Sequence, residues 1–376
     1  MHILFILDYF TPHRGGSETV FENIISRLIK KGHKISVLTS HFDKKLKNIE
    51  KHNNLTIYRT GKNRIRFMIS GLFLGIKLLR KNKDIKIIHT STYGGAIPAS
   101  ILGLLFKKKV ILTIHEIFGK LRIFYKGKFW GFFYRLFENL IFQFPYSIYH
   151  CVSIYTLNSL RISYKIPDNK LKMIHNGVDM DFWDINKIDE SKIKDLKEKY
   201  GLKNSIVLLY YGHAGKSKGI DYLVKAIPEI LKINPKIKLI FNLINSKRKN
   251  HIKQEIIKLQ KRNPDKIILF EGFEMEELRN LIACCDMVIA PSISEGFGSV
   301  HTESVAMGKT LLTTNIASIP EVVRGKVKFV NPRSSNEIIK GVKNILEGKI
   351  ESITTKAFSR DNTVTKIEKL YKNLSD

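Results

Sequence analysis

Two glutamates eight residues apart offer the clearest chemistry in this sequence. The segment APSISEGFGSVHTESVAMGK follows a predicted strand, with Glu295 in a Gly-Phe-Gly loop and Glu303 in the helix predicted after it. A helical carboxylate can accept hydrogen bonds from two vicinal ribose hydroxyls, while loop N–H groups can meet phosphates. Glu295, at the mouth of the loop, is placed to meet a sugar. The simpler alternative is a pair of surface glutamates on an ordinary strand–helix unit.

Two glycine-containing loops also stand between a predicted strand and a predicted helix. Gly15 and Gly16 follow the first strand, and in YYGHAGKSKGIDYLVKAI a basic loop begins at Gly212. Glycine lets the backbone approach a ligand closely, and a helix start offers free N–H groups to an anion. Lys216 and Lys218 would neutralise a diphosphate as point charges. A plain turn is the alternative for both loops. It is favoured for the first loop taken by itself, whereas the position of the second loop, after a strand and before a helix, favours a functional role.

Two further groups of titratable residues are candidates for a functional site. His115 and Glu116 end a predicted strand in ILTIHEIFG, where a histidine can point into a ligand cleft. A hydrogen-bonded core histidine is the commoner case. Asp179 and Asp181 form a carboxylate pair of the kind that binds metals, but no buried strand precedes them. We therefore expect no metal there.

The elements that must position these residues alternate between strand and helix, which predicts an α/β fold with two parallel sheets. Asn176–Tyr200 is polar and charged, and is the best candidate for a linker between two halves; a lone helix is expected over Asn362–Leu374. The predicted strands are His2–Asp8, Lys34–Ser40, Leu55–Thr60, Ile85–Thr90, Val110–His115, Ser147–Ser153 and Leu171–Ile174, then Ile206–Tyr211, Ile237–Ile244, Lys266–Phe270, Asp286–Pro291, Thr310–Thr314 and Lys328–Val330.

Composition narrows the class of protein. The chain has 376 residues, 43% of them hydrophobic, enough for two cores, and no uninterrupted apolar run long enough to span a bilayer. Three cysteines cannot form a disulfide framework, and the opening MHILFILDYF is typical of a strand rather than a signal peptide, so we expect a cytoplasmic protein. The net charge of +30 attracts anions, although a general lysine bias explains much of it. No nucleic-acid-binding motif accompanies the charge, so we expect no nucleic-acid partner.

Taken in order, six motifs resemble a known family. RGGSE (14–18), HE (115–116), HNGVD (175–179), GHAGKSKG (212–219), EGFGSVHTE (295–303) and IPEVV (319–323) look like those of a retaining GT-B glycosyltransferase of family 4. The resemblance implies two Rossmann-like domains with a cleft between them. The acceptor domain would be 1–175 with a C-terminal helix, 360–376, that crosses back to it. The donor domain would be 176–359.

The resemblance also implies roles for individual residues. His115 and Glu295 would be catalytic, beside the transferred sugar. The nucleotide-diphosphate sugar would be bound by Gly15, Gly16, Gly212, His213, Lys216, Lys218, Phe297, Gly298, Ser299, Val300 and Glu303. Glu303 would hold the ribose and Lys218 the diphosphate. No cofactor and no metal would be needed, because lysine, helix ends and loop N–H groups stabilise the leaving group.

One position departs from the family pattern. The family usually has arginine where this chain has His213, so a bidentate, always-charged phosphate contact is replaced by a single, pH-dependent one. This departure keeps open a catalytically silent, membrane-associated binding module. A nucleotide-sugar 2-epimerase is the other alternative, because it shares the architecture. The expected function remains transfer of a hexose to a lipid-linked or cell-surface glycan acceptor.

The region Phe118–Tyr149 is unusually aromatic and basic. It holds 13 of the chain's 38 aromatic residues in 32 positions. A helix over Phe129–Phe144 would line one face with Phe129, Phe133, Leu136, Phe137, Leu140, Ile141 and Phe144, which the domain core would cover. The proposed membrane and acceptor face consists of Lys126, Lys128, Trp130, Phe132 and Arg135, with Lys120 and Arg122 nearby.

A second basic amphipathic stretch, Arg64–Lys83, supports the same interpretation, since basic residues among exposed aromatics suit an anionic membrane surface. An internally packed helix pair is the alternative. We therefore expect a peripheral protein on the inner face of the membrane.

Overall fold

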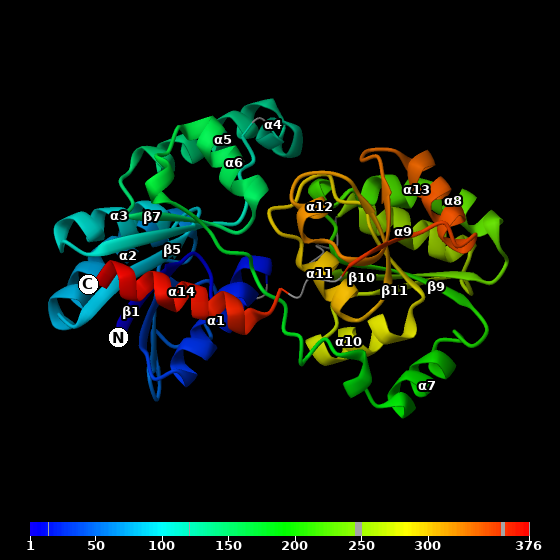
Figure 1. The fold of residues 1–376 in the computed structure, drawn as a ribbon, viewed down its shortest axis with the longest axis horizontal. Helices are drawn as coiled ribbons and strands as arrows, with labels where there is room; N and C mark the ends of the chain where they lie inside the picture. The colour runs from blue at the N-terminus through cyan, green and yellow to red at the C-terminus, as the bar shows by residue number, and fades with distance from the viewer. Residues whose placement is uncertain (14, 120, 245–249, 355–357, 376) are drawn as a thin grey trace. The chain divides into compact units, whose positions relative to one another are not determined.

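The computed structural model describes residues 1–13, 15–119, 121–244, 250–354 and 358–375. The chain forms two compact units, Met1–Gly177 with Ser359–Asp376, and Val178–Phe358 (Figure 1). The boundaries expected from the sequence, after 175 and after 359, lie within two residues of these. Arg14 of the first motif and Lys120 of the aromatic region lie outside the described residues.

The first unit is built on an eight-stranded sheet in the order β3-β4-β2-β1-β5-β6-β7-β8. All neighbours pair in parallel except β3 and β4, and the central β1, HILFIL, is buried at every position, as a strand covered on both faces requires. The strands are β1 His2–Leu7, β2 Lys34–Ser40, β3 Ile49–His52, β4 Leu55–Thr60, β5 Ile85–Ser91, β6 Lys109–Ile114, β7 Ile148–Cys151 and β8 Leu171–Met173.

Helices cover both faces of this sheet. One core cluster joins α1 and the C-terminal α14 to one face, with Phe21 and Tyr371 fully buried in it. The other cluster includes residues of α2, α3, α5 and α6. The helices are α1 Gly16–Lys30, α2 Arg64–Lys81, α3 Ala96–Leu105, α4 Leu121–Lys126, α5 Lys128–Gln143, α6 Ile154–Tyr164 and α14 Arg360–Ser375, with a 3-10 turn at Asp168–Lys170.

The second unit has a seven-stranded sheet in the order β11-β10-β9-β12-β13-β14-β15, parallel except for the β14–β15 pair. Its strands are β9 Ile206–His213, β10 Ile237–Ile244, β11 Ile267–Phe270, β12 Met287–Ala290, β13 Thr310–Thr314, β14 Gly325–Val330 and β15 Glu351–Ile353.

Helices also cover both faces of the second sheet: α8, α9 and α13 share one core cluster, while α10 and α7 pack together on the other side (Figure 1). The helices are α7 Glu190–Lys199, α8 Ile220–Ile233, α9 His251–Arg262, α10 Met275–Cys284, α11 Ser299–Ala306, α12 Ile319–Val322 and α13 Ser335–Leu346, with 3-10 turns at Ile185–Lys187 and Lys216–Lys218.

Each sheet reverses its strand order once. In the first unit the chain passes to β2 on one side of β1 and later to β5 on the other; in the second unit β10 and β12 flank β9 in the same way. Ligands of doubly wound folds bind outside the carboxyl ends of strands at such switch points. The fold therefore directs attention to the loops after β1 and β5, and to those after β9 and β12.

Two expectations about the elements are wrong, the second only in part. Residues 178–200 are not a linker: they belong to the second unit, where Trp183 is fully buried and α7 packs on α10. The face of α5 that was expected to lie against the core is covered only in part: Ile141 is buried, and Phe137 and Phe144 pack on the core. Phe129, Phe133, Leu136 and Leu140 are exposed, because the buried face of the helix consists of Gly131, Glu138, Ile141 and Phe142.

Candidate functional site

In the second unit, the loops that follow β9 and β12 pack directly on each other. Gly219 has a φ of +64°, and a Cβ there would overlap the carbonyl oxygen of Pro291, so only glycine fits. The Ile293 N–H donates to the Ser217 carbonyl over 2.7 Å. These contacts fix the basic loop 214–219 against the segment that carries Glu295.

Glu295 is almost fully buried and is held by three neighbours. Its carboxylate accepts hydrogen bonds from Lys218 Nζ and Ser292 Oγ, each at 2.7 Å, and its carbonyl accepts one from Ser318 Oγ at 2.9 Å. Burial alone would raise its pKa, but the Lys218 ammonium and the hydrogen bonds from Lys218 and Ser292 to the carboxylate bring the pKa below its usual range. Glu295 is therefore an ionised acceptor, and the structure brings together two residues that the sequence assigned to one site.

Glu303 lies on the inner side of α11, buried next to β9. Tyr211 Oη donates to its carboxylate over 3.4 Å and to the Val300 carbonyl over 2.9 Å. The tyrosine therefore links the end of β9 to the first turn of α11. The sequence reasoning did not assign a role to Tyr211. Its position just before Gly212, at the end of a predicted strand, could have indicated one.

The loop before α11 and its first turn contain the remaining residues that were predicted to contact the donor. Gly298, with a φ of +85°, precedes the helix, and Ser299 and Val300 open it, half-buried. Phe297 is buried beside Phe358. Backbone N–H groups at such a helix start attract anions.

His301 was missed by the sequence reasoning. It is fully buried on α11, and its Nε2 lies 2.9 Å from Thr313 Oγ1, while Nδ1 has no hydrogen-bond partner among the described residues. Burial lowers its pKa, so the ring is neutral, and it interacts electrostatically with Glu295. Its place between the two glutamates was the signal that could have found it.

His213 and Lys216 are both exposed at the carboxyl end of β9, where the predicted diphosphate contacts belong. Gly212 has a φ of +136°, a backbone angle that residues other than glycine rarely adopt. These positions agree with a basic, accessible loop, with His213 on its surface.

In the first unit, His115 directly follows β6 and packs edge-to-face on Phe21 of α1, with ring centroids 5.7 Å apart. Its Nε2 is buried without a hydrogen-bond partner among the described residues. Burial, and then His150, lowers the pKa of His115 to about 3, so the imidazole is neutral. An unsatisfied buried ring nitrogen does not match the alternative of a hydrogen-bonded core histidine.

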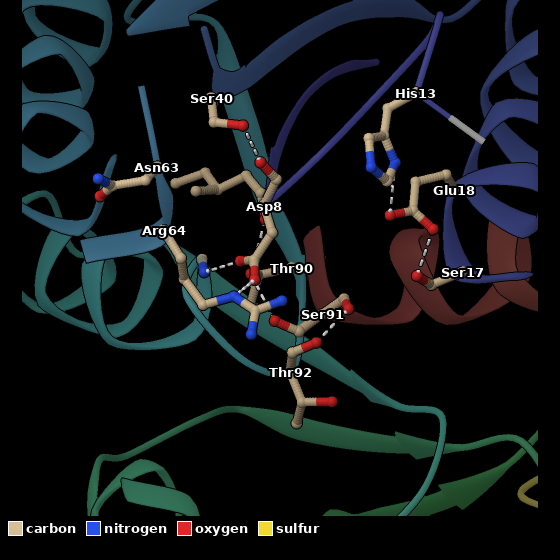
Figure 2. Close-up of polar contacts among 12 residues, drawn as sticks. Asp8, His13, Ser17, Glu18, Ser40, Asn63, Arg64, Thr90, Ser91 and Thr92 are labelled. Atoms are coloured by element: carbon tan, nitrogen blue, oxygen red, sulfur yellow. Dashed lines mark hydrogen bonds and ion pairs between the residues drawn. The ribbon is translucent and has the colours of Figure 1, made fainter. Parts of the chain in front are cut away.

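The glycine loop before α1 is organised by Glu18. Its carboxylate lies 3.3 Å from His13 and accepts from Ser17 Oγ at 2.8 Å (Figure 2). A Cβ at Gly15 would overlap this carboxylate, whereas one at Gly16 would meet nothing within 4 Å. A side chain at position 15 would therefore displace the Glu18 carboxylate from its present position.

A polar cluster that the sequence reasoning missed lies at the switch point of the first sheet. Asp8, immediately after β1, accepts hydrogen bonds from Arg64 Nε at 2.5 Å and the Gly95 N–H at 2.7 Å, and Ser40 Oγ donates to its carbonyl (Figure 2). Arg64, expected among the membrane-facing cations, is thus paired with Asp8. An acidic residue directly after the first buried strand was the signal for this cluster.

Glu138 is a second missed residue, buried on α5. Its carboxylate accepts the Gly119 N–H at 2.9 Å, and Tyr93 and Tyr164 donate to it at 3.1 and 3.2 Å. Arg122 stands 3.5 Å away as its countercharge. Glu138 therefore ties α5 to the loop that follows His115, and nothing in the sequence distinguishes it from a surface glutamate.

The residues of the predicted membrane face separate into two groups. Lys126, Lys128, Trp130 and Phe132 are exposed, but Arg135 is half-buried beside a cavity of about 620 Å³. That cavity is lined by Gly119, Arg135, Asn139, Phe142, Gln143, Ser163 and Tyr164. Arg135 therefore belongs to a polar pocket between α5 and α6.

The aspartate pair makes local contacts. Asp181 pairs with Lys187 at 2.9 Å, and Asp179 accepts the Phe182 N–H at 3.2 Å. In the described part of the chain, no three His, Cys, Asp or Glu side chains gather as metal ligands.

Comparison with known proteins agrees with this architecture. Residues 14–182 match the family described as Glycosyltransferase Family 4, and residues 192–361 match that described as Glycosyl transferases group 1. The fold resembles sucrose-phosphate synthase of Thermosynechococcus elongatus (TM-score 0.76, 16% identity, covering 100% of this chain and 96% of that one). It also resembles Anabaena HepE in complex with UDP and glucose (TM-score 0.75, 18% identity, covering 99% and 100%).

Two curated relatives extend over most of the chain. An uncharacterized glycosyltransferase of Methanocaldococcus jannaschii is 24% identical over 349 residues, 88% of this chain and 85% of the relative. The phosphatidylinositol N-acetylglucosaminyltransferase GPI3 subunit of Saccharomyces cerevisiae is 21% identical over 388 residues, 98% of this chain and 79% of the relative.

The two doubly wound units have the GT-B fold of these solved structures. The chain belongs to the group 1 glycosyltransferases, with a first half of the family 4 type.

Proposed function

We propose that this chain is a retaining hexosyltransferase that takes its sugar from a nucleotide-diphosphate donor and gives it to a lipid-linked or cell-surface glycan. One observation carries the proposal: an ionised, buried Glu295 bound to Lys218 lies at the switch point of the second sheet, in the segment that leads to Glu303. In this assignment Glu303 binds the ribose and Lys218 the diphosphate.

The transfer needs charge stabilisation more than proton transfer from the protein. As the bond from sugar to diphosphate breaks, Lys218, Lys216 and the N–H groups at the start of α11 would stabilise the negative charge on the leaving group. We propose that they do so without a cofactor. The departing phosphate would take the acceptor proton on the same face of the sugar, which retains the anomeric configuration. Glu295 and His115 would orient the sugar.

We propose that the acceptor is carried on a lipid at the inner face of the membrane, within the cytoplasm. The cavity beside Arg135 has amide, hydroxyl and guanidinium groups suited to a polar headgroup, and the exposed aromatic face of α5 adjoins it. The yeast relative, a phosphatidylinositol N-acetylglucosaminyltransferase subunit, supports such an acceptor.

A thermal-shift screen of UDP-glucose, UDP-N-acetylglucosamine and GDP-mannose tests the donor assignment, because a ligand that binds the native state raises the unfolding temperature. One donor should stabilise the protein and be hydrolysed slowly. NMR should show that the sugar is released with the anomeric configuration of the donor, before the free sugar equilibrates between its anomers. The same assay with a chelator tests whether a divalent metal is needed.

The alternatives give different results. A silent binding module would be stabilised by a donor without hydrolysing it or transferring its sugar. A 2-epimerase would convert the nucleotide sugar to its epimer without an acceptor. Stabilisation by none of the donors would contradict the proposed function.

A further inference from the structure

The outward face of α5 is apolar and uncovered. The exposed fractions of Phe129 and Trp130 are 67% and 63%, and Phe132, Phe133, Leu136 and Leu140 are exposed with them. The opposite face is anchored: a Cβ at Gly131 would overlap Ile123 of α4, and Glu138 is bonded to the loop after His115. The helix is thus held rigidly by one side while its other side presents aromatic rings to the surroundings.

Helix α2 presents a second apolar outward face. Ile65, Ile69 and Phe73 are exposed at intervals of four residues, which places them on one side of the helix. Both helices contribute to the same core cluster over the same face of the first sheet.

Charge indicates what this surface binds. Four cations at these helices are exposed: Lys62 just before α2, Arg66 in its first turn, Lys126 at the end of α4 and Lys128 at the start of α5. Helix α2 contains no acidic residue, and the one acidic residue of α5, Glu138, is buried. Two copies of this chain would bring like charges together, which opposes self-association through this face. A surface of aromatic rings edged by cations complements negatively charged lipid headgroups above acyl chains.

We propose that the outward faces of α2 and α5 dock on an anionic lipid bilayer. The contact is interfacial, with both helices lying on the bilayer: within the described residues, no helix is long and apolar enough to cross one. This inference rests on the surface alone, so it stands or fails separately from the transferase activity.

The two tryptophans make the test specific. Trp130 is exposed on α5, while Trp183 is fully buried in the second unit. In a Trp183→Phe variant, fluorescence reports on Trp130 alone. Adding mixed phosphatidylglycerol–phosphatidylcholine vesicles should shift its emission to shorter wavelength, and lipids brominated on the acyl chains should quench it. If this variant folds poorly, the difference between wild type and Trp130→Phe gives the same signal.

Co-sedimentation with the same vesicles measures affinity. Trp130→Ala with Phe132→Ala should weaken binding at least tenfold. Replacing Lys126 and Lys128 by Gln should weaken it about fivefold for each cation lost, and added salt should do the same. Lys225→Gln with Lys343→Gln is the matched control: both lysines are exposed on the second unit, and binding should not change. Thermal unfolding shows that each variant is folded.

Three outcomes would overturn the proposal. Equal binding to pure phosphatidylcholine would remove the role of charge, and equal loss in the control pair would show a non-specific effect of net charge. A dimer in solution that is broken by Trp130→Ala with Phe132→Ala, together with no vesicle binding, would assign the surface to a second copy of the chain.

Discussion

Lys218 donates a hydrogen bond from its ammonium group to the buried carboxylate of Glu295 over 2.7 Å. Lys218 lies on the loop after β9, and Glu295 on the loop after β12, the strands that flank the switch point. The bond therefore joins the residue assigned to the diphosphate with the residue assigned to the sugar.

Lys218→Met should destabilise the second unit, because it leaves the Glu295 carboxylate buried with only Ser292 as a side-chain donor among the described residues. Removing one partner of a buried pair costs about 3–5 kcal/mol, and we expect the lower end because Lys218 is partly exposed. Urea unfolding measures the loss. The double variant Lys218→Met with Glu295→Gln should recover part of it, since no buried charge remains. A double variant no more stable than Lys218→Met would contradict this account.

Glu303→Ala should weaken binding of the free nucleoside diphosphate, because the ribose hydroxyls lose a charged acceptor worth about 1.5–3 kcal/mol. Calorimetric titration measures the change. Glu295→Ala and His115→Ala should instead lower turnover more than they weaken nucleotide binding. Wild-type nucleotide affinity in the first variant, or wild-type turnover in the other two, would remove the corresponding assignment.

His213→Arg should tighten donor binding, because His213 is exposed at the end of β9 and an arginine there restores an always-charged, bidentate phosphate contact. The measurement is the dissociation constant of the nucleoside diphosphate across pH 5 to 8, which should become less pH-dependent. Weaker binding would mean that this loop is adapted to histidine. His213→Gln is the control, because it removes the titratable ring without adding a bidentate guanidinium group.

Glu138→Gln should destabilise the first unit for two reasons. The neutral amide does not compensate the positive charge of Arg122, and its NH₂ group is a donor that would face other hydrogen-bond donors. We expect a loss of about 3 kcal/mol in urea unfolding. Turnover should fall as well, since the loop after His115 loses its anchor at Gly119. Glu22→Gln, at an exposed position of α1, should change neither quantity. Full stability in Glu138→Gln would show that the hydrogen bonds alone hold this loop.

Hydrophobic pattern was sufficient to predict the buried parallel strands, because each is a short apolar run between polar turns. The strands β3 (IEKH) and β15 (ESI) were missed for the same reason: they are short, mostly exposed, antiparallel edge strands with no apolar run. The helix α5 was predicted, but its buried face was only partly right: Ile141 is buried as expected, whereas the burial of Gly131 and Glu138 was not expected. Glu138 can be buried because Tyr93, Tyr164, Gly119 and Arg122 contact its carboxylate, and periodicity does not show such partners.

Motif spacing brought Glu295, Lys218 and Glu303 to attention, because each stands next to a glycine turn between strand and helix. Asp8, His301 and Glu138 were missed because their importance depends on tertiary neighbours. Asp8 matters through Arg64 and Gly95, which lie 56 and 87 residues away along the chain. Sequence patterns of a few residues cannot reveal contacts at such separations.

Three histidines of the first unit whose pKa values are lowered should make the protein sensitive to mild acid. Burial lowers the pKa of His150 to about 4 and that of His115 to about 3, and His89 is also well below its usual value. In the unfolded chain each titrates near 6.5. Their contribution to stability is therefore complete above about pH 6.5 and is lost as pH falls toward the folded values, because the unfolded state takes up protons first.

At pH 5 each of these histidines should lower the free energy of unfolding by about 2 kcal/mol, before buried carboxylates such as Glu295 begin to contribute. Urea unfolding at half-unit steps between pH 7 and 5 gives the slope. His89 bonds Tyr371 of α14 and Thr113 of β6, so His89→Gln should reduce the slope by about one proton while lowering stability at pH 7. His52→Gln, at an exposed position of β3, is the control. A free energy of unfolding that stays constant from pH 7 to 5 would mean that the histidines are protonated in the folded protein.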